Sequence, residues 1–170
     1  MQKKTEIKKA IMRKYPEQVV LVTTRGKKGN ANVMAVGWTG IASGDPLMFM
    51  LGIDDEAYTY ALIKETREFV IAFPSEKMAK ETLHAGSFHG NDRDKITEAG
   101  IKIQDAEKVK APLLADAVAN FECELVEIYR PGDCPLIIGK VVAAHENADP
   151  EIKRLYTVGK NHLLAGVRQI

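Results

Sequence analysis

The residues best placed for binding chemistry interrupt one apolar stretch, residues 30–53. Asn32, Thr39, Ser43 and the chain's only tryptophan, Trp38, stand among apolar side chains there, together with four glycines. Glycine inside a strand weakens it and often marks a close approach of the backbone to a ligand. A plain core strand does not need Asn, Trp and Gly so close together, so the stretch predicts the wall of a binding site. An ordinary edge residue (Asn32) and core residue (Trp38) are the open alternative.

Two later positions suit an anionic group. Thr59 falls in the first turn of a predicted helix, where free backbone N–H groups and the helix dipole favour a phosphate. Lys95 is a cation that can reach the same kind of group, and Ser87 lies in the loop before it. The alternatives are a surface threonine at 59, and a solvated loop with a capped helix over Ser87 and residues 91–95.

The common signatures of nucleotide, metal and hydrolase chemistry are absent from the sequence. It has no G-x-G-x-x-G after a strand, no G-x-x-x-x-G-K-[ST], no H-E-x-x-H and no G-x-S-x-G. The four histidines and the two cysteines, Cys123 and Cys134, show no ligand spacing, so no metal site is predicted. A nicotinamide would have to bind on a fold other than the Rossmann fold.

Composition sets the class of protein. A chain of 170 residues suits one domain of ordinary size, and its 45% apolar content is typical of globular proteins. The net charge of +1 gives no electrostatic footprint for nucleic acid, and no apolar run approaches the length of a membrane span. The charged N-terminus is not followed by an apolar signal-peptide region. We therefore expect a cytoplasmic protein with reduced thiols and no nucleic-acid or membrane partner.

The strands that must position these residues are read from apolar and β-branched runs. They are predicted at 18–24, twice within 30–53 around a turn at 43–46, and at 68–73, 117–129 and 136–145, and residues 162–167 form a terminal apolar piece. Within 117–129 the apolar parity switches after Leu125, which predicts a β-bulge. About seven strands that do not alternate regularly with helices favour an antiparallel barrel over a doubly wound parallel sheet.

Short helices are predicted between the strands. They are expected at 5–14, from a cap at Asp54 or Asp55 to 64, from a Ser75 cap to 84, from an Asn91 cap to 99, and from Asp149 to Gly159. The first helix should end at Tyr15, because the residue before a proline avoids the helical region. Residues 85–90 are predicted as a loop, and residues 101–116 as irregular structure.

Taken together, these pieces stand in an order that resembles the flavin reductase-like family of FMN-binding split barrels, and within it the flavoredoxin-like branch. The resemblance covers nearly the whole chain and rests on order and spacing rather than on one specific motif. The matching pieces are Val22–Thr24, Asn32–Trp38, Asp45-Pro46, Tyr58-Thr59, Leu62-Ile63, Glu68-Phe69, Ser87 through Lys95, Phe121–Cys123, Gly132-Asp133 and Gly139–Val142.

The resemblance implies a fold, a ligand and an assembly. The fold would be mainly β with a few short helices, an FMN-binding Greek-key split β-barrel, as a single flavin reductase-like domain over residues 1–170. The protein would form a homodimer with non-covalent FMN near the subunit interface. The implied flavin-binding positions are Asn32, Val33, Met34, Ala35, Val36, Trp38, Tyr58, Thr59, Ser87 and Lys95.

The sequence departs from the family pattern at one informative place. The branch usually has a histidine after Gly-Asp in a hairpin loop, and here Cys134 follows Asp133. A neutral thiol is a poor hydrogen-bond donor, so Cys134 would do the work of that histidine badly at neutral pH. Cys134 and Lys95 are the candidate catalytic residues.

The resemblance implies an oxidoreductase that reduces flavin or a small acceptor with NAD(P)H. Two other functions stay open. One is a flavoredoxin-type carrier that passes electrons between redox-protein partners, and the other is a non-enzymatic flavin-binding module. A split barrel like the pyridoxamine-phosphate oxidases fits the motif order less well.

Overall fold

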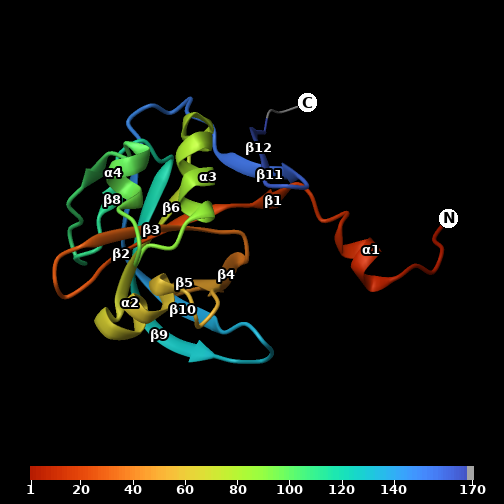
Figure 1. Cartoon of the computed structure of the whole chain (residues 1–170), viewed down its shortest axis with the longest axis horizontal. Coiled ribbons are helices and arrows are strands. Elements are labelled where there is room, and N and C mark those ends of the chain that lie inside the picture. The colour runs from red at the N-terminus through yellow and green to blue at the C-terminus, as the bar shows by residue number, and fades with distance from the viewer. Residues whose placement is uncertain (168–170) are drawn as a thin grey trace.

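An antiparallel sheet of seven strands forms the centre of the molecule, in the order β3-β2-β6-β9-β10-β5-β4 (Figure 1). The computed structural model describes residues 1–167. The strands are β2 (Val20–Arg25), β3 (Ala31–Val36), β4 (Thr39–Gly44), β5 (Leu47–Gly52), β6 (Glu68–Phe73), β9 (Ala119–Tyr129) and β10 (Leu136–Glu146). The prediction of a mainly β fold with antiparallel pairing is therefore confirmed.

The sheet curls because its two edge strands are consecutive in the chain. β3 ends at Val36 and β4 begins at Thr39, so only Gly37 and Trp38 connect the opposite edges. Three peptide steps span at most about 11 Å, which forces the edges to approach each other. The edges are not neighbours in the hydrogen-bonded strand order, so the barrel is split at this seam.

The stretch 30–53 contains three strands rather than the predicted two. The predicted turn at 43–46 is confirmed, because β4 ends at Gly44 and β5 begins at Leu47. The break at Gly37 was missed because apolar residues continue on both sides of it. It is visible only when the strands are placed in the sheet, where the chain leaves one edge for the other.

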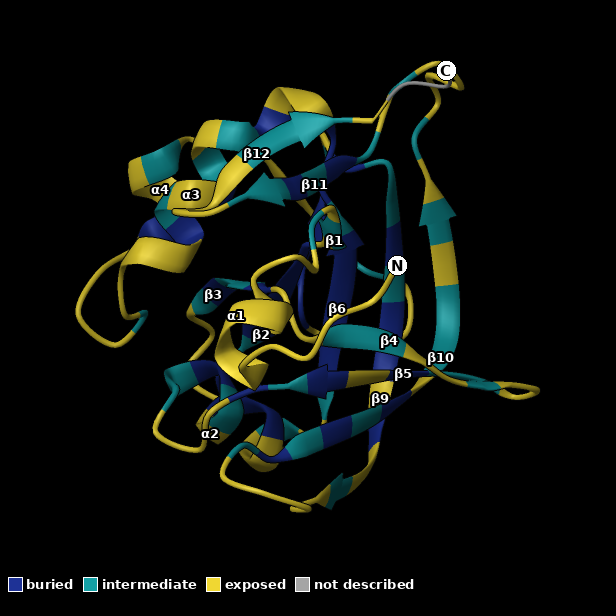
Figure 2. Ribbon diagram, turned by 90° about the vertical axis from the view of Figure 1, so that its right-hand side faces the viewer, coloured by how far each residue is buried: buried dark blue, intermediate teal, exposed yellow. Residues whose placement is uncertain are grey.

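The central strands are apolar on both faces because a core lies against each face (Figure 2). On β2, Val20 and Val22 point into the barrel interior, where they pack with Phe69 and other buried side chains. Leu21 points the other way, into a second core beneath the helices α3 (Ala79–Ser87) and α4 (Lys95–Ala99). These helices are thereby fixed against the face of the sheet beside β3.

The predicted β-bulge in β9 is confirmed. Ile138 of β10 pairs with Glu127 of β9, whereas the next residue, Gly139, pairs with Leu125. Val126 is therefore the extra residue, at the point where the apolar parity of the sequence switches. A Cβ at Gly139 would lie 2.3 Å from Cζ of Phe69, so only glycine lets the core phenylalanine pack against the bulged strand.

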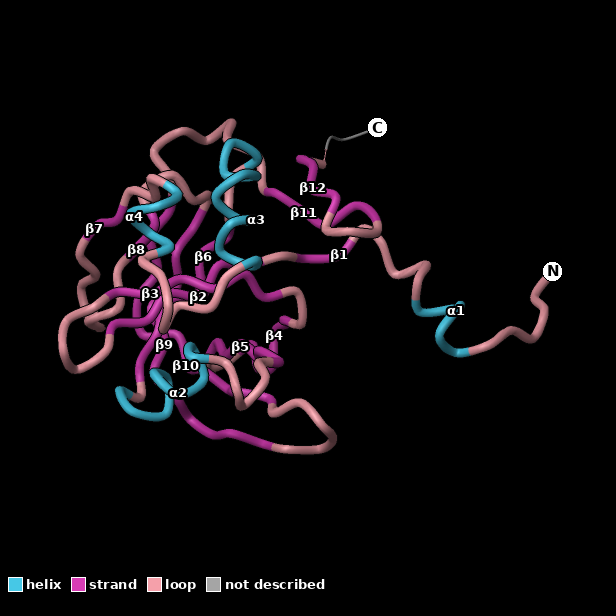
Figure 3. The backbone as a smooth tube through the Cα atoms, viewed as in Figure 1, coloured by secondary structure: helices cyan, strands magenta, loops and turns pink. Residues whose placement is uncertain are grey.

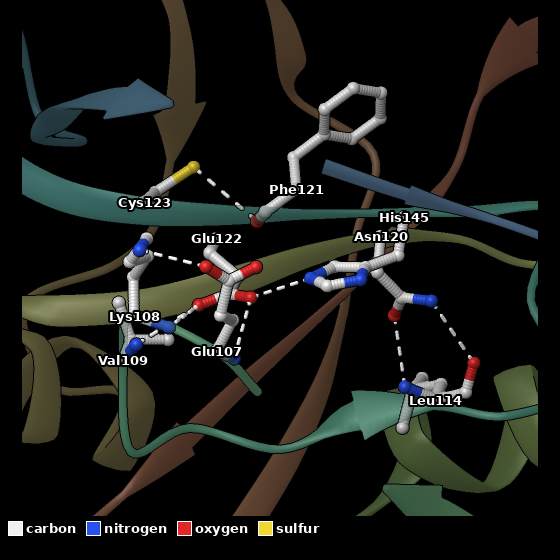
Figure 4. A network of polar contacts seen from close by, with 9 residues as sticks. All are labelled: Glu107, Lys108, Val109, Leu114, Asn120, Phe121, Glu122, Cys123 and His145. Carbon is white, nitrogen blue, oxygen red and sulfur yellow. Dashed lines mark hydrogen bonds and ion pairs between the residues drawn. The ribbon is translucent and has the colours of Figure 1, made fainter. Parts of the chain in front are cut away.

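A buried carboxylate on β9 holds the segment 101–116 against the sheet (Figure 4). The Glu122 carboxylate accepts backbone hydrogen bonds from Glu107, Lys108 and Val109 at 2.8, 2.6 and 2.9 Å, and contacts Nε2 of His145 at 2.6 Å. Burial alone would raise the pKa of Glu122, but these hydrogen bonds outweigh burial and lower it. The segment was predicted irregular; it also contains a short pair of strands, β7 (Ile103–Gln104) and β8 (Leu113–Leu114).

The helices are close to their predicted places, but three predicted caps are wrong. They are α1 (Ile7–Ile11), α2 (Tyr58–Thr66), the 3₁₀ turn η1 (Glu76–Met78), α3 and α4 (Figure 3). Ala57 precedes α2 without a side-chain cap, because Asp54 instead accepts the backbone N–H of Glu56 in a turn. The Ser75 hydroxyl caps nothing. Asp94, not Asn91, caps α4 by accepting the N–H of Thr97.

The predicted helix 149–159 is wrong, and a hairpin takes its place. Asp149 accepts the backbone N–H of Glu151, which makes a local turn rather than a helix start. The apolar residues after it form β11 (Leu155–Gly159), which pairs with β12 (Leu163–Gly166) and with β1 (Glu17–Gln18). Helix α3 also runs to Ser87, through half of the predicted loop 85–90. No helix in the described part of the chain is long and apolar enough to span a membrane.

Candidate functional site

Two adjoining hollows lie beside the seam of the barrel, between β3 and helix α3. The large hollow has a volume of about 590 Å³ and the small hollow about 270 Å³. Both are within or near the range of about 300–1,000 Å³ that is usual for small-molecule sites. The residues that line both are Met34, Ala35, Asp54, Gly86 and Ser87. The hollows therefore form one continuous groove. Such a groove suits a ligand with two chemically different ends.

The large hollow has an apolar wall next to the seam and polar lining residues, such as Thr82 and His162, elsewhere. Met34, Val36 and Trp38 line it from β3 and the link to β4. Trp38 is 61% exposed although it is the largest apolar side chain in the protein. A Cβ at Gly52 would lie 3.0 Å from Cβ of Trp38, so this glycine lets the strand pass beneath the tryptophan. An exposed aromatic ring over a glycine offers a flat apolar surface to a planar ligand.

The small hollow lies at the N-terminus of α2. The free N–H groups of the first helical turn have no side-chain cap there, which makes the helix end a ready anion site. Thr59 is buried at this point, and its hydroxyl accepts a 2.9 Å hydrogen bond from Nδ2 of Asn32. Because that bond uses the oxygen as acceptor, the hydroxyl proton of Thr59 is left to donate into the small hollow.

Lys95 closes the other side of the small hollow. Its Nζ donates hydrogen bonds of 3.0 Å to the backbone carbonyls of Ala85 and Phe88 at the end of α3. An ammonium group has three donors, so one remains for a ligand. Burial lowers the pKa of Lys95 to about 8, which leaves the group mostly charged at neutral pH. The small hollow thus offers an anion a hydroxyl, a cation and a helix N-terminus.

The structure brings most of the predicted binding residues together. The side chains that line the groove are Met34, Ala35, Val36, Trp38, Tyr58, Thr59, Ser87 and Lys95. Asn32 lies behind Thr59 and orients it. Val33 points into the core beneath the helices, as expected from its alternation with Met34 along β3.

Cys134 lies close to the groove without lining either hollow. A Cβ added at Gly52 would lie 3.7 Å from its Sγ and 3.0 Å from Cβ of Trp38, which places the thiol near the side of Gly52 that the tryptophan covers. Burial and the nearby carboxylates of Asp54 and Asp133 raise the pKa of Cys134. The thiol is therefore kept protonated, and it lies beside Gly52 and Trp38 without belonging to the lining of the large hollow.

Sequence reasoning missed the lining that α3 and the β11–β12 hairpin supply. Thr82 on α3 lines the large hollow, is buried, and has no hydrogen-bond partner for its hydroxyl among the described residues. Thr157, His162 and Leu164 reach the same hollow from the hairpin. The hairpin residues were hidden by the wrong helix prediction for 149–159. Thr82 gave no signal, because a threonine inside a helix is common.

Comparison with known proteins agrees with this fold. The family model described as "Flavin reductase like domain" matches residues 12–162, so the chain belongs to the flavin reductase-like family. An uncharacterized protein of Pyrococcus abyssi is 37% identical over 145 residues, which cover 82% of this chain and 83% of that protein. The family resemblance seen in the sequence is therefore confirmed.

Solved structures show the same fold. A flavoredoxin from Methanosarcina acetivorans superposes with a TM-score of 0.86 at 24% identity, covering all of this chain and 93% of that one. An FMN-binding protein from Thermus thermophilus, crystallised with p-hydroxybenzaldehyde, gives 0.85 at 24% identity, covering 100% and 98%. The expected split-barrel fold is confirmed by these neighbours.

Proposed function

We propose that the protein binds FMN non-covalently in the groove and uses it to reduce a flavin or another small acceptor with electrons from NAD(P)H. The observation that carries the proposal is the two-part groove. A hollow with an apolar wall beside the exposed Trp38 continues into a hollow where Thr59, Lys95 and the start of α2 converge. A flat ring joined to a phosphate has the same two-part chemistry.

Two buried polar groups suit a flavin whose ring lies in the large hollow and whose phosphate lies in the small hollow. The buried hydroxyl of Thr82 and Oδ1 of Asn32 have no hydrogen-bond partner among the described residues. Buried polar groups are costly unless they are satisfied, and a ligand rich in ring nitrogens, carbonyls and ribityl hydroxyls can supply partners. Thr82 lines the large hollow, where a ring would lie, and Asn32 lies behind Thr59, which lines the small hollow.

The division of labour among the residues follows from the groove. Thr59, Lys95 and the first N–H groups of α2 would hold the phosphate, with Asn32 fixing the rotamer of Thr59. Met34, Val36 and Trp38 would exclude water from one face of the ring. When bound, FMN supplies the hydride-accepting and electron-donating chemistry that no side chain of this groove has.

The large hollow has room and polar groups for a second molecule. Its lining includes His162 and Thr157 of the hairpin and Lys14, whose Nζ pairs with Glu17 at 2.7 Å. This favours an enzyme that admits a donor and an acceptor in turn. A flavoredoxin-type carrier between redox proteins is the second candidate, supported by the shared fold with a flavoredoxin. In either case we expect a homodimer.

Stopped-flow mixing tests the proposal. The purified protein should be yellow, release FMN on denaturation, and lose its flavin absorbance rapidly when mixed anaerobically with NADH or NADPH. An inert flavin that is nevertheless reduced by a redox protein would move the function to the carrier. Recovery of FAD, or of no flavin after reconstitution with FMN, would contradict the proposal as a whole.

A further inference from the structure

The N-terminal arm, residues 1–14, stands off from the body except at its base, where Lys14 pairs with Glu17 and lines the large hollow (Figure 1). It contains the short helix α1, which has no buried residue. Ile7 and Ile11 lie one turn apart on the same face of this helix, and they are 87% and 56% exposed. Figure 2 shows the whole helix as exposed ribbon.

Such a helix needs a partner. Isolated helices shorter than about 12–15 residues are marginal in water, and α1 has only five residues with no side-chain cap. In proteins, helical stability comes mainly from packing of an apolar face. We therefore expect the apolar face of α1, formed by Ile7, Ala10 and Ile11, to pack against a surface of another molecule.

The charge of the arm favours a second copy of the chain as that partner. The arm carries six lysines and arginines and one acidic residue. Of the 24 basic and 23 acidic residues of the whole chain, 18 and 22 therefore remain in residues 15–170, so the arm is strongly basic and the body is acidic. A near-neutral protein is thus divided into two parts of opposite sign, which attract each other between copies.

A groove that suits the arm lies at its base. The outer groove is a hollow of about 450 Å³ on the outer face of the barrel, lined among others by Pro16, Trp38, Met50 and Leu136. Trp38 and Met50 are 61% and 38% exposed, so the groove presents uncovered apolar side chains. Pro16 joins the arm to the body at this groove, and the arm leads away from it.

We propose that the arm of one protomer packs the face of Ile7 and Ile11 into the outer groove of a second copy, against Trp38. The arm and the outer groove of one copy both adjoin Pro16. A two-fold axis beside Pro16 therefore places each arm at the groove of the other copy. Trp38 also lines the large hollow, so the exchanged arm covers the outer side of the groove's aromatic wall. That last consequence rests on the proposed function, whereas the docking itself does not.

The first test is the oligomeric state of arm variants. Wild type should sediment with twice the chain mass of 18.8 kDa. The double substitution Ile7→Glu with Ile11→Glu should raise the dimer dissociation constant at least tenfold. Gln2→Glu with Thr5→Glu adds the same two charges outside the apolar face and should raise it much less. Equal effects of the two pairs, or a wild type that stays monomeric, would overturn the proposal.

The second test locates the arm without any flavin readout. The chain has one tryptophan, so its indole N–H gives a single resonance. A nitroxide on Thr5→Cys, in a Cys134→Ser background that leaves only the buried Cys123, is mixed with ¹⁵N-labelled protein that has no nitroxide. Broadening of the Trp38 indole signal in the mixture supports exchange between copies. No broadening, or binding of monomers to anionic vesicles instead, contradicts it.

Discussion

The side-chain amide of Asn32 on β3 donates a 2.9 Å hydrogen bond to the hydroxyl of Thr59 on α2. The bond joins the sheet to the helix N-terminus and fixes the direction in which the Thr59 hydroxyl can donate. Nδ2 of Asn32 also lies 3.4 Å from Oγ1 of Thr24 on β2, so the arrangement is anchored on two strands. A phosphate in the small hollow would therefore meet a donor that is already oriented.

Thr59→Ala should weaken FMN binding far more than riboflavin binding. A hydrogen bond to a charged group contributes about 1.5–3 kcal/mol, which corresponds to roughly a tenfold to a hundredfold loss of affinity. Riboflavin has no phosphate and should lose little. Fluorescence titration of both ligands measures this difference. Thr66→Ala is the matched control, because its hydroxyl bonds to Leu62 at the far end of the same helix. Equal losses for FMN and riboflavin would remove Thr59 from the phosphate site.

The affinity for FMN should fall as the pH rises above about 8. Burial lowers the pKa of Lys95 to about 8, so the ammonium loses its proton in this window and its attraction for a phosphate disappears. The phosphate itself is already doubly charged there, since its second pKa is about 6. Titrations between about pH 6.5 and 9.5 should show a slope for FMN and none for riboflavin. Lys95→Arg should flatten the FMN slope; a slope that persists in this variant assigns the titration elsewhere.

His162→Gln should impair reduction by NADH or NADPH while leaving FMN affinity nearly unchanged. The exposed His162 lines the outer part of the large hollow from the hairpin, where a second molecule would meet it. One neutral hydrogen bond is worth about 0.5–1.5 kcal/mol, so kcat/KM should drop roughly two- to tenfold. Anaerobic stopped-flow reduction gives the rate.

Cys134→Ser and Cys134→His, measured in parallel, show whether the reacting molecules meet Cys134 in the loop before β10 or only His162 in the β11–β12 hairpin. Cys134 lines neither hollow and serine is close to it in size, so we expect Cys134→Ser to match wild type. If Cys134→His instead changes the rate or its pH dependence, position 134 reaches the reacting molecules, as the family pattern implies.

Glu122→Gln should destabilise the fold most strongly above pH 5. The hydrogen bonds to the carboxylate lower its pKa in the folded state, so it contributes stability that is fully present above its unfolded pKa and is lost as the pH falls through the lower folded value. An amide must turn one N–H₂ toward backbone donors, which costs about 1–3 kcal/mol.

Thermal unfolding at pH 7 and at pH 4 measures the effect of Glu122→Gln. The gap between variant and wild type should narrow at the lower pH. The exposed Glu124 on the same strand supplies the control, Glu124→Gln, which should leave both melting temperatures close to wild type. A constant gap at all pH values would mean that shape, not charge, holds the 101–116 segment.

The strands and the floor of the groove were predictable from local pattern. The apolar runs of β2 and β6 reflect burial on both faces. The parity switch at Val126 reports a bulge that belongs to strand β9 itself. Asn32 and Trp38 stood out because their residue types are unusual in an apolar run. These signals are contained within a few neighbouring residues.

The rest of the site depends on contacts between distant segments. Residues 155–159 form a strand because β1 and β12 are there to pair with them, and nothing within the segment specifies this. The same pairing brings His162 to the groove. The position of Cys134 beside Gly52 likewise follows from the pairing of Leu136 with Gly52, which the hairpin motif alone does not show.

The two-residue link at Gly37 and Trp38 couples the closure of the barrel to the width of the groove, so that the two change together. An insertion there would let the edges of the sheet separate and would draw the tryptophan away from the hollow in the same movement. The opposite change, a stiffer link, would narrow both. Variants in loop length at this one position can therefore tune how firmly a bound molecule is gripped while the chemistry of every lining side chain stays the same.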